Sequence, residues 1–129
     1  MKEDRRTFRK TDRPLSDEER VLTRWILEHG TAEGVGFLEQ LDRARVVGGC
    51  PCGCASIDFA IDGSGEAPVG VHTLGEFVFG IGEDELFGVM VFSANGILSG
   101  LEVYGFGADA PKTLPKPSEL RPMPKTTEN

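Results

Sequence analysis

The chain has 129 residues, 17 of them glycine, and a formal net charge of −7. This length fits one domain that folds without disulfides or metals, and glycine at about twice its usual share favours a sheet with tight turns over a helical bundle. No apolar run approaches the ~20 residues that cross a bilayer, and the polar first residues lack the apolar core of a secretory signal. We therefore expect a cytoplasmic protein that does not bind membranes.

The charge is unevenly distributed along the chain. Residues 1–13 have a net charge of +3, residues 14–111 of −12 and residues 112–129 of +2. A body this acidic repels phosphate backbones, so we do not expect nucleic-acid binding. It can instead steer association with a basic protein surface.

A capping box predicts where the first helix begins. Residues 1–13 alternate charges without a hydrophobic period and predict a flexible basic arm. Ser16 then stands three residues before Glu19, as in a capping box, with acidic residues in the first turn. Apolar residues at helical spacing, followed by Gly30, predict a helix over 17–29.

A second helix is predicted directly after the first. Thr31 can cap it, although Gly34 and Gly36 weaken its helix propensity. Residues 44–47 are compatible with a short strand and with a lead into the next loop.

The apolar pattern changes to the strand period after residue 56. Alternation predicts a half-buried strand over 57–61. Residues 69–74 and 76–81 are also strand-like, with glycines that introduce bulges or split one long strand into two.

A hairpin is predicted where residues 86–93 meet residues 97–104, because Asn95-Gly96 is the favoured pair for a primed two-residue turn. In this register Phe92 is opposite Ser99, Met90 opposite Leu101 and Gly88 opposite Val103, and this face is expected to meet the helices. The other face carries Phe87, Val89, Val91, Leu98, Gly100, Glu102 and Tyr104. It is more hydrophobic than a solvated face needs to be, so we expect the tail or a partner to cover it.

Five prolines follow residue 108, so residues 108–129 are predicted to form an extended tail. The expected fold is α+β, with two N-terminal helices packed on one face of an antiparallel sheet of about 4–6 strands. Residues 14–107 are expected to form its single domain.

The stretch 48–56, GGCPCGCAS, holds all the cysteines of the chain: Cys50, Cys52 and Cys54. Zinc sites usually place two to four residues between neighbouring cysteines, not one. In a flat strand the outer two would lie about 13 Å apart, whereas thiolates on one zinc ion lie within roughly 4 Å of each other. A tight turn at Pro51 or Gly53 would be needed to gather them, with His72 as a fourth ligand.

Other interpretations of the cysteines remain open. The odd count and the cytoplasmic expectation disfavour a structural disulfide, and no nucleophile signature indicates a reactive thiol. We favour small buried side chains in a loop that glycine and proline shape. The acidic stretch 83–85 lacks the ligand spacing of a calcium loop and predicts a solvated turn.

Three stretches together resemble a group of small bacterial proteins for which no activity is established. They are PLSDEER at 14–20, CGCASI at 52–57 and SGLEVY at 99–104, followed by a proline-rich ending. The resemblance implies a compact single domain and a bacterial origin, and it carries over no catalytic residue. Small acidic proteins of this kind are similar in size and charge to immunity proteins that bind toxins.

The sequence therefore favours a non-enzymatic, acidic module that binds a protein partner or itself and needs no cofactor. Its expected contact residues are Asp84, Glu102 and Tyr104. The alternative is a metal- or thiol-dependent protein that uses Cys50, Cys52, Cys54 and His72, with zinc as the metal.

Overall fold

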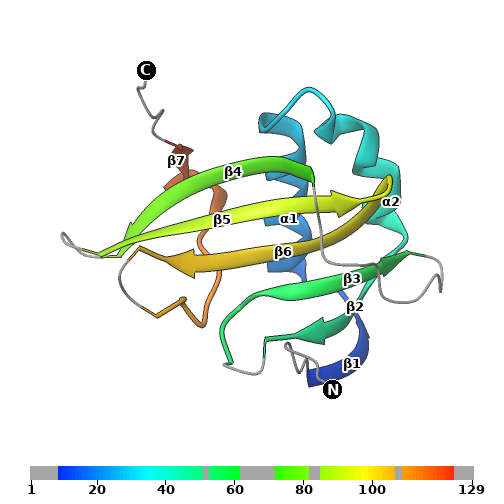
Figure 1. Ribbon diagram of the computed structural model, residues 1–129, viewed down its shortest axis with the longest axis horizontal. Coiled ribbons are helices and arrows are strands. Elements are labelled where there is room, and N and C mark those ends of the chain that lie inside the picture. Colours follow the sequence, from blue (N-terminus) through cyan, green and yellow to red (C-terminus); the bar gives the residue numbers. More distant parts are fainter. Residues whose placement is uncertain (1–8, 51–52, 62–71, 82–84, 107–108, 124–129) are drawn as a thin grey trace.

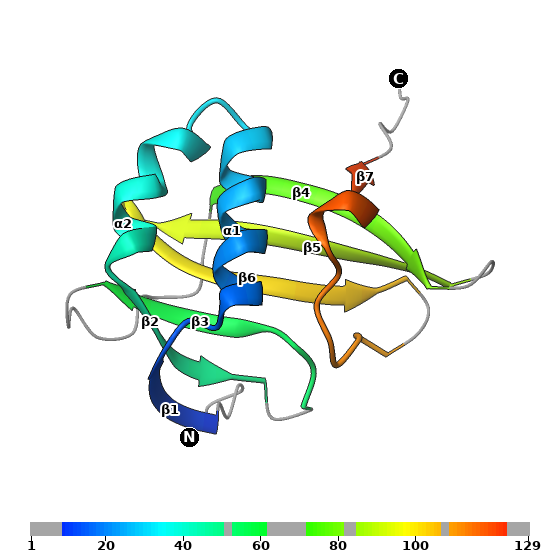
Figure 2. The same ribbon diagram turned by 180° about the vertical axis from the view of Figure 1, so that it is seen from behind.

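The computed structural model describes residues 9–50, 53–61, 72–81, 85–106 and 109–123. They form an α+β fold in which one seven-stranded antiparallel sheet carries its helices on a single face (Figure 1, Figure 2). The strand order is β1-β2-β3-β6-β5-β4-β7. The strands are β1 (Arg9–Pro14), β2 (Ala44–Gly49), β3 (Ile57–Ile61), β4 (His72–Ile81), β5 (Glu85–Ala94), β6 (Ile97–Gly105) and β7 (Arg121–Pro122). Within the described ranges, neither α-helix has the length and apolar run that a membrane span requires.

The first helix, α1 (Asp17–His29), begins and ends where the sequence predicts. The Ser16 Oγ accepts a hydrogen bond from the Glu19 backbone N, and the Ser16 N donates to the Glu19 carboxylate, so the capping box is complete. Gly30 ends the helix, and its N–H donates to the Ile26 carbonyl. The buried side of α1 includes Leu22 and Ile26, which have no exposed surface.

The second predicted helix is shorter than expected. A 3-10 turn, η1 (Gly34–Phe37), leads into α2 (Leu38–Asp42), and Thr31 does not cap it. Instead the Thr31 carbonyl accepts a hydrogen bond from the Gly34 N. Gly34 packs so closely on the backbone of Leu27 that any side chain there would overlap it.

The sheet has seven strands rather than the predicted four to six. Arg9 to Arg13, predicted as part of a flexible arm, instead form most of β1 and pair with β2. The stretch left open at 44–47 belongs to β2. Within the proline-rich tail, β7 adds two residues beside Phe77 and Val78 of β4, and a short 3-10 turn, η2 (Pro117–Glu119), precedes it.

The hairpin of β5 and β6 has the predicted turn but not the predicted register. Asn95 and Gly96 both have positive φ, as a primed turn requires. An irregularity between Phe92 and Ser93 then brings Phe92 opposite Gly100 and Met90 opposite Glu102. The predicted faces are therefore wrong for β5, because one extra residue changes which side chains of the two strands share a face. Gly100, Glu102 and Tyr104 of β6 keep the face on which they were predicted.

Contacts of α1 identify the buried face of the sheet. Trp25 of α1 meets Phe77 edge to face at 4.9 Å between ring centroids, and Phe77 pairs with Val89, which pairs with Val103. Val89 has no exposed surface. The described tail, residues 109–123, crosses this same face beside α1 (Figure 2), so it does not cover the opposite face.

Candidate functional site

The side of β3, β4, β5 and β6 that points away from α1, called here the open face, is covered by no described helix or tail segment (Figure 1). Strand pairing arranges its residues in rows that cross the sheet. The rows are Phe92 and Gly100; then Glu76, Met90 and Glu102; then Val78, Gly88 and Tyr104. Met90, Phe92 and Tyr104 are half-buried although nothing described packs above them.

Tyr104 is fixed across this face by a glycine and a carboxylate. Its ring lies over Gly88, where an added Cβ would come within 2.6 Å of the Tyr104 Cε2. Its hydroxyl donates a hydrogen bond to the Glu76 carboxylate. Burial, the hydrogen bond to Glu76 and the negative charges of Glu76 and Glu102 together raise the pKa of Tyr104 well above its usual value. The phenol therefore stays a neutral donor.

The row below Tyr104 places two carboxylates on either side of a thioether. Glu76 pairs with Met90, and Met90 pairs with Glu102. Asp58 belongs to the same face, opposite Gly100. On β3 to β6, every charged side chain that the structure describes on this face is thus acidic.

Apolar side chains stand at one end of the open face. Leu86 is 36% exposed and Phe106 is 47% exposed. The Phe106 N donates to the Leu86 carbonyl, and the Phe106 ring meets Tyr104 edge to face at 5.4 Å. The open face therefore combines an acidic row with an aromatic and aliphatic end.

Two of the three predicted contact residues come together here. Glu102 and Tyr104 lie on the open face, and the charge of Glu102 acts on the Tyr104 hydroxyl. Asp84 lies outside the described residues. Glu76 and Met90 were not predicted, because their place beside Glu102 depends on the pairing of three strands.

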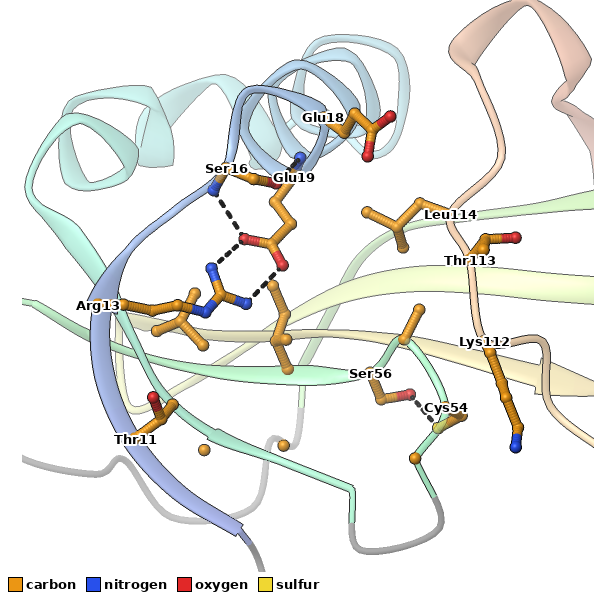
Figure 3. A pocket seen from close by; sticks show the side chains of 16 residues that line it. Thr11, Arg13, Ser16, Glu18, Glu19, Cys54, Ser56, Lys112, Thr113 and Leu114 are labelled. Carbon is orange, nitrogen blue, oxygen red and sulfur yellow. Dashed lines mark hydrogen bonds and ion pairs between the residues drawn. The ribbon is translucent and has the colours of Figure 1, made fainter.

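A cleft on the opposite side of the sheet reaches the cysteine loop (Figure 3). Its volume is about 630 Å³, and it lies between β1, the start of α1, the loop before β3 and the tail. Its polar walls include Thr11, Arg13, Glu19, Cys54, Ser56 and Lys112. This volume is in the range of small-molecule sites.

One wall of the cleft is an ion pair that joins β1 to α1. Both terminal nitrogens of Arg13 donate to the Glu19 carboxylate, at 2.9 and 2.8 Å. Burial alone would raise the pKa of Glu19, but hydrogen bonds from Arg13 and Ser16 and the charge of Arg13 outweigh it and lower that pKa. The hydrogen bond to Glu19 likewise raises the pKa of Arg13.

The facing wall is the cysteine loop. The Gly53 N donates to the Cys50 carbonyl, and Gly53 has a φ of 87°, so the chain turns sharply there. The Cys54 thiol donates to the Ser56 hydroxyl at 3.4 Å. Ser56 in turn exchanges two hydrogen bonds with the backbone of Val103, extending the pairing of β3 with β6.

The described cysteines and His72 belong to different parts of the fold. Cys50 and Cys54 lie in the loop between β2 and β3, whereas His72 begins β4 and has its Nε2 3.7 Å from the Glu33 carboxylate. Cys52 lies outside the described residues. Among the described residues, no three His, Cys, Asp or Glu side chains are grouped so that they could hold a metal ion.

No protein-family model, curated protein or solved structure matches the chain. The basis for assigning a function is therefore the open face and the cleft themselves.

Proposed function

We propose that the protein is a non-enzymatic binding protein whose open face takes a basic and partly apolar surface of another protein. The observation that supports this most directly is the combination on one uncovered sheet face of Leu86, Phe106 and Tyr104 with the carboxylates of Glu76 and Glu102. Aromatic residues and methionine are enriched in protein interfaces, and an acidic surface accelerates encounter with a basic partner.

A different protein fits this face better than a second copy of the chain. Two copies joined through their open faces would bring the acidic rows of both molecules together, and like charges in an interface cost several kcal/mol. An immunity-type protein that neutralises a basic toxin is one member of the class that this surface fits.

The experiment uses two lysine substitutions of exposed apolar residues on opposite sides of the sheet. Leu86→Lys changes the open face, whereas Val21→Lys changes α1, where Val21 is 55% exposed. Each variant and the unmodified protein are titrated calorimetrically with the purified basic products of neighbouring genes. We expect Leu86→Lys to weaken binding at least about ten-fold and Val21→Lys to leave it unchanged. Equal binding by both variants, or no binding by any product, contradicts the proposal.

A second candidate function is thiol- or metal-dependent chemistry at the cleft, because the Cys54 thiol lies in its wall. Zinc content and thermal stability are compared between freshly purified protein and a Cys52→Ser variant. Metal-free samples of equal stability would remove the metal-dependent form. Alkylation of Cys54 no faster than that of a free cysteine would remove the thiol-dependent form.

A further inference from the structure

We infer that the partner inserts an arginine side chain between Glu76 and Glu102, above Met90 and beside the ring of Tyr104. The inference deepens the proposed function and rests on it. It names the chemical group that the open face recognises.

The spacing of the acidic row suits one cation. Glu76, Met90 and Glu102 lie on three adjacent strands, and neighbouring strands are about 4.8 Å apart, so the two glutamate Cα atoms are separated by roughly 10 Å. The Met90 thioether between them carries no charge and occupies the surface of the sheet between the two carboxylates. A single positive group above Met90 can therefore donate hydrogen bonds to both carboxylates.

The ring of Tyr104 favours arginine over lysine. Its position is fixed on one side by close packing over Gly88 and at its tip by the hydrogen bond to Glu76. A planar guanidinium stacks on such a ring, is weakly hydrated and offers several donors to two carboxylates. An ammonium group is more strongly hydrated and loses more on leaving water.

Leu86 supplies a second anchor at a defined distance. It stands four residues before Met90 on β5, which corresponds to about 13 Å along a strand, and Phe106 lies beside it. The partner segment is therefore expected to carry an apolar residue about 13 Å from the arginine. In an extended segment this is a spacing of four residues.

The test uses NMR, because single short peptides bind weakly. The chain contains three methionines, so carbon-13 labelling of their methyl groups gives a simple spectrum in which a Met90→Leu variant identifies the Met90 signal. The first probe is a blocked peptide with leucine and arginine four residues apart and serines elsewhere. The second probe has lysine in place of the arginine.

Matched double variants separate the acidic row from overall charge. Glu76→Gln with Glu102→Gln changes the open face, and Tyr104 can still donate to the glutamine oxygen. Glu28→Gln with Glu39→Gln removes the same charge from exposed helical positions.

We expect the arginine peptide to shift the Met90 signal and to bind about five-fold more tightly than the lysine peptide. The open-face double variant should weaken binding about ten-fold, and the helix double variant less than about two-fold. Equal losses of peptide affinity in the two double variants, or equal affinity for the two peptides, overturn the inference.

Failure of the inference can be distinguished from failure of the proposed function. If neither peptide moves the Met90 signal while Leu86→Lys still weakens binding of a protein partner, the inference is wrong and the proposed function stands. If Leu86→Lys also leaves the affinity for the partner protein unchanged, both the inference and the proposed function are wrong.

Discussion

Tyr104 and Glu76 are joined by a hydrogen bond that spans the strand between them. Tyr104 lies on β6 and Glu76 on β4, and the ring reaches across β5 because Gly88 has no side chain there. This contact orders the centre of the open face in the protein on its own. A side chain that is already ordered loses less entropy on binding.

The ionisation of Tyr104 provides a direct check of this contact. Tyr104 is the only tyrosine in the chain, so absorbance of the tyrosinate reports on it alone. Burial, the Glu76 hydrogen bond and the charges of Glu76 and Glu102 raise its pKa. We expect Glu76→Gln to bring the pKa down towards its usual value of about 10, because a charge beside the phenol is removed. An unchanged titration would mean that Glu76 does not act on Tyr104.

The raised pKa of Tyr104 also predicts how the stability of the protein changes at alkaline pH. The folded protein holds the Tyr104 proton more tightly than the unfolded chain does, so its stabilising contribution is complete below about pH 10 and is lost as the pH rises further. The free energy of unfolding should therefore fall more steeply above pH 10 in the unmodified protein than in Tyr104→Phe. Urea titrations of both proteins between pH 9 and 11 measure the difference, and parallel curves would contradict the expectation.

Features that depend on neighbouring residues could be predicted from the sequence. The capping box of Ser16 and Glu19 and the turn at Asn95 and Gly96 are determined within four residues, and both are present. The α+β class and the antiparallel sheet were also predicted, since they follow from the apolar periods.

Features that depend on distant pairing could not be predicted. The charged, irregular pattern of Arg9–Pro14 does not indicate a strand, and it becomes one by pairing with β2 more than 30 residues away. The bulge beside Ser93 changes the register by one residue and moves Val89 and Val91 to the buried face. Glu102 and Tyr104 were expected on the uncovered face and lie there, but the approach of Glu76 requires β4 to pair with β5.

Gly30 is expected to be intolerant of any side chain. A Cβ at Gly30 would lie 2.6 Å from the Gly75 Cα and would also overlap the Leu74 carbonyl, both of which are backbone atoms that cannot turn aside. Gly30→Ala should lower the free energy of unfolding by about 1–3 kcal/mol. The control is Gly36→Ala, where a Cβ meets nothing within 4 Å. Its effect should be neutral or slightly stabilising in chemical denaturation, and equal losses in both variants would contradict the proposed packing.

Removal of the Thr23 hydroxyl is expected to stabilise the protein. It has no exposed surface, and its Oγ1 has no hydrogen-bond partner among the described residues. Valine has nearly the same shape without the buried polar atom, so Thr23→Val should raise the free energy of unfolding by about 1 kcal/mol. The exposed Thr113→Val serves as the control and should change little. A loss of stability in Thr23→Val would show that the hydroxyl does have a partner.

The pair of Arg13 and Glu19 should contribute to stability at neutral pH and lose that contribution in acid. Because the pKa of Glu19 is lowered in the folded protein, its contribution is present above about pH 4.5 and disappears as the pH falls through the folded value. Glutamine can also complete a capping box, so Glu19→Gln removes the charge and keeps the cap.

We expect Glu19→Gln to lower the free energy of unfolding by about 1–2 kcal/mol at pH 7. The two proteins should converge in stability as the pH falls below 4.5 and through the folded pKa of Glu19. Glu28→Gln is the matched control, because Glu28 pairs with Arg24 at 3.8 Å on the exposed surface of the same helix, and such pairs contribute little. Urea unfolding across this pH range measures all three proteins. A constant difference between Glu19→Gln and the unmodified protein at every pH would mean that Glu19 acts through packing, because an effect of its charge must vanish once the carboxylate is protonated.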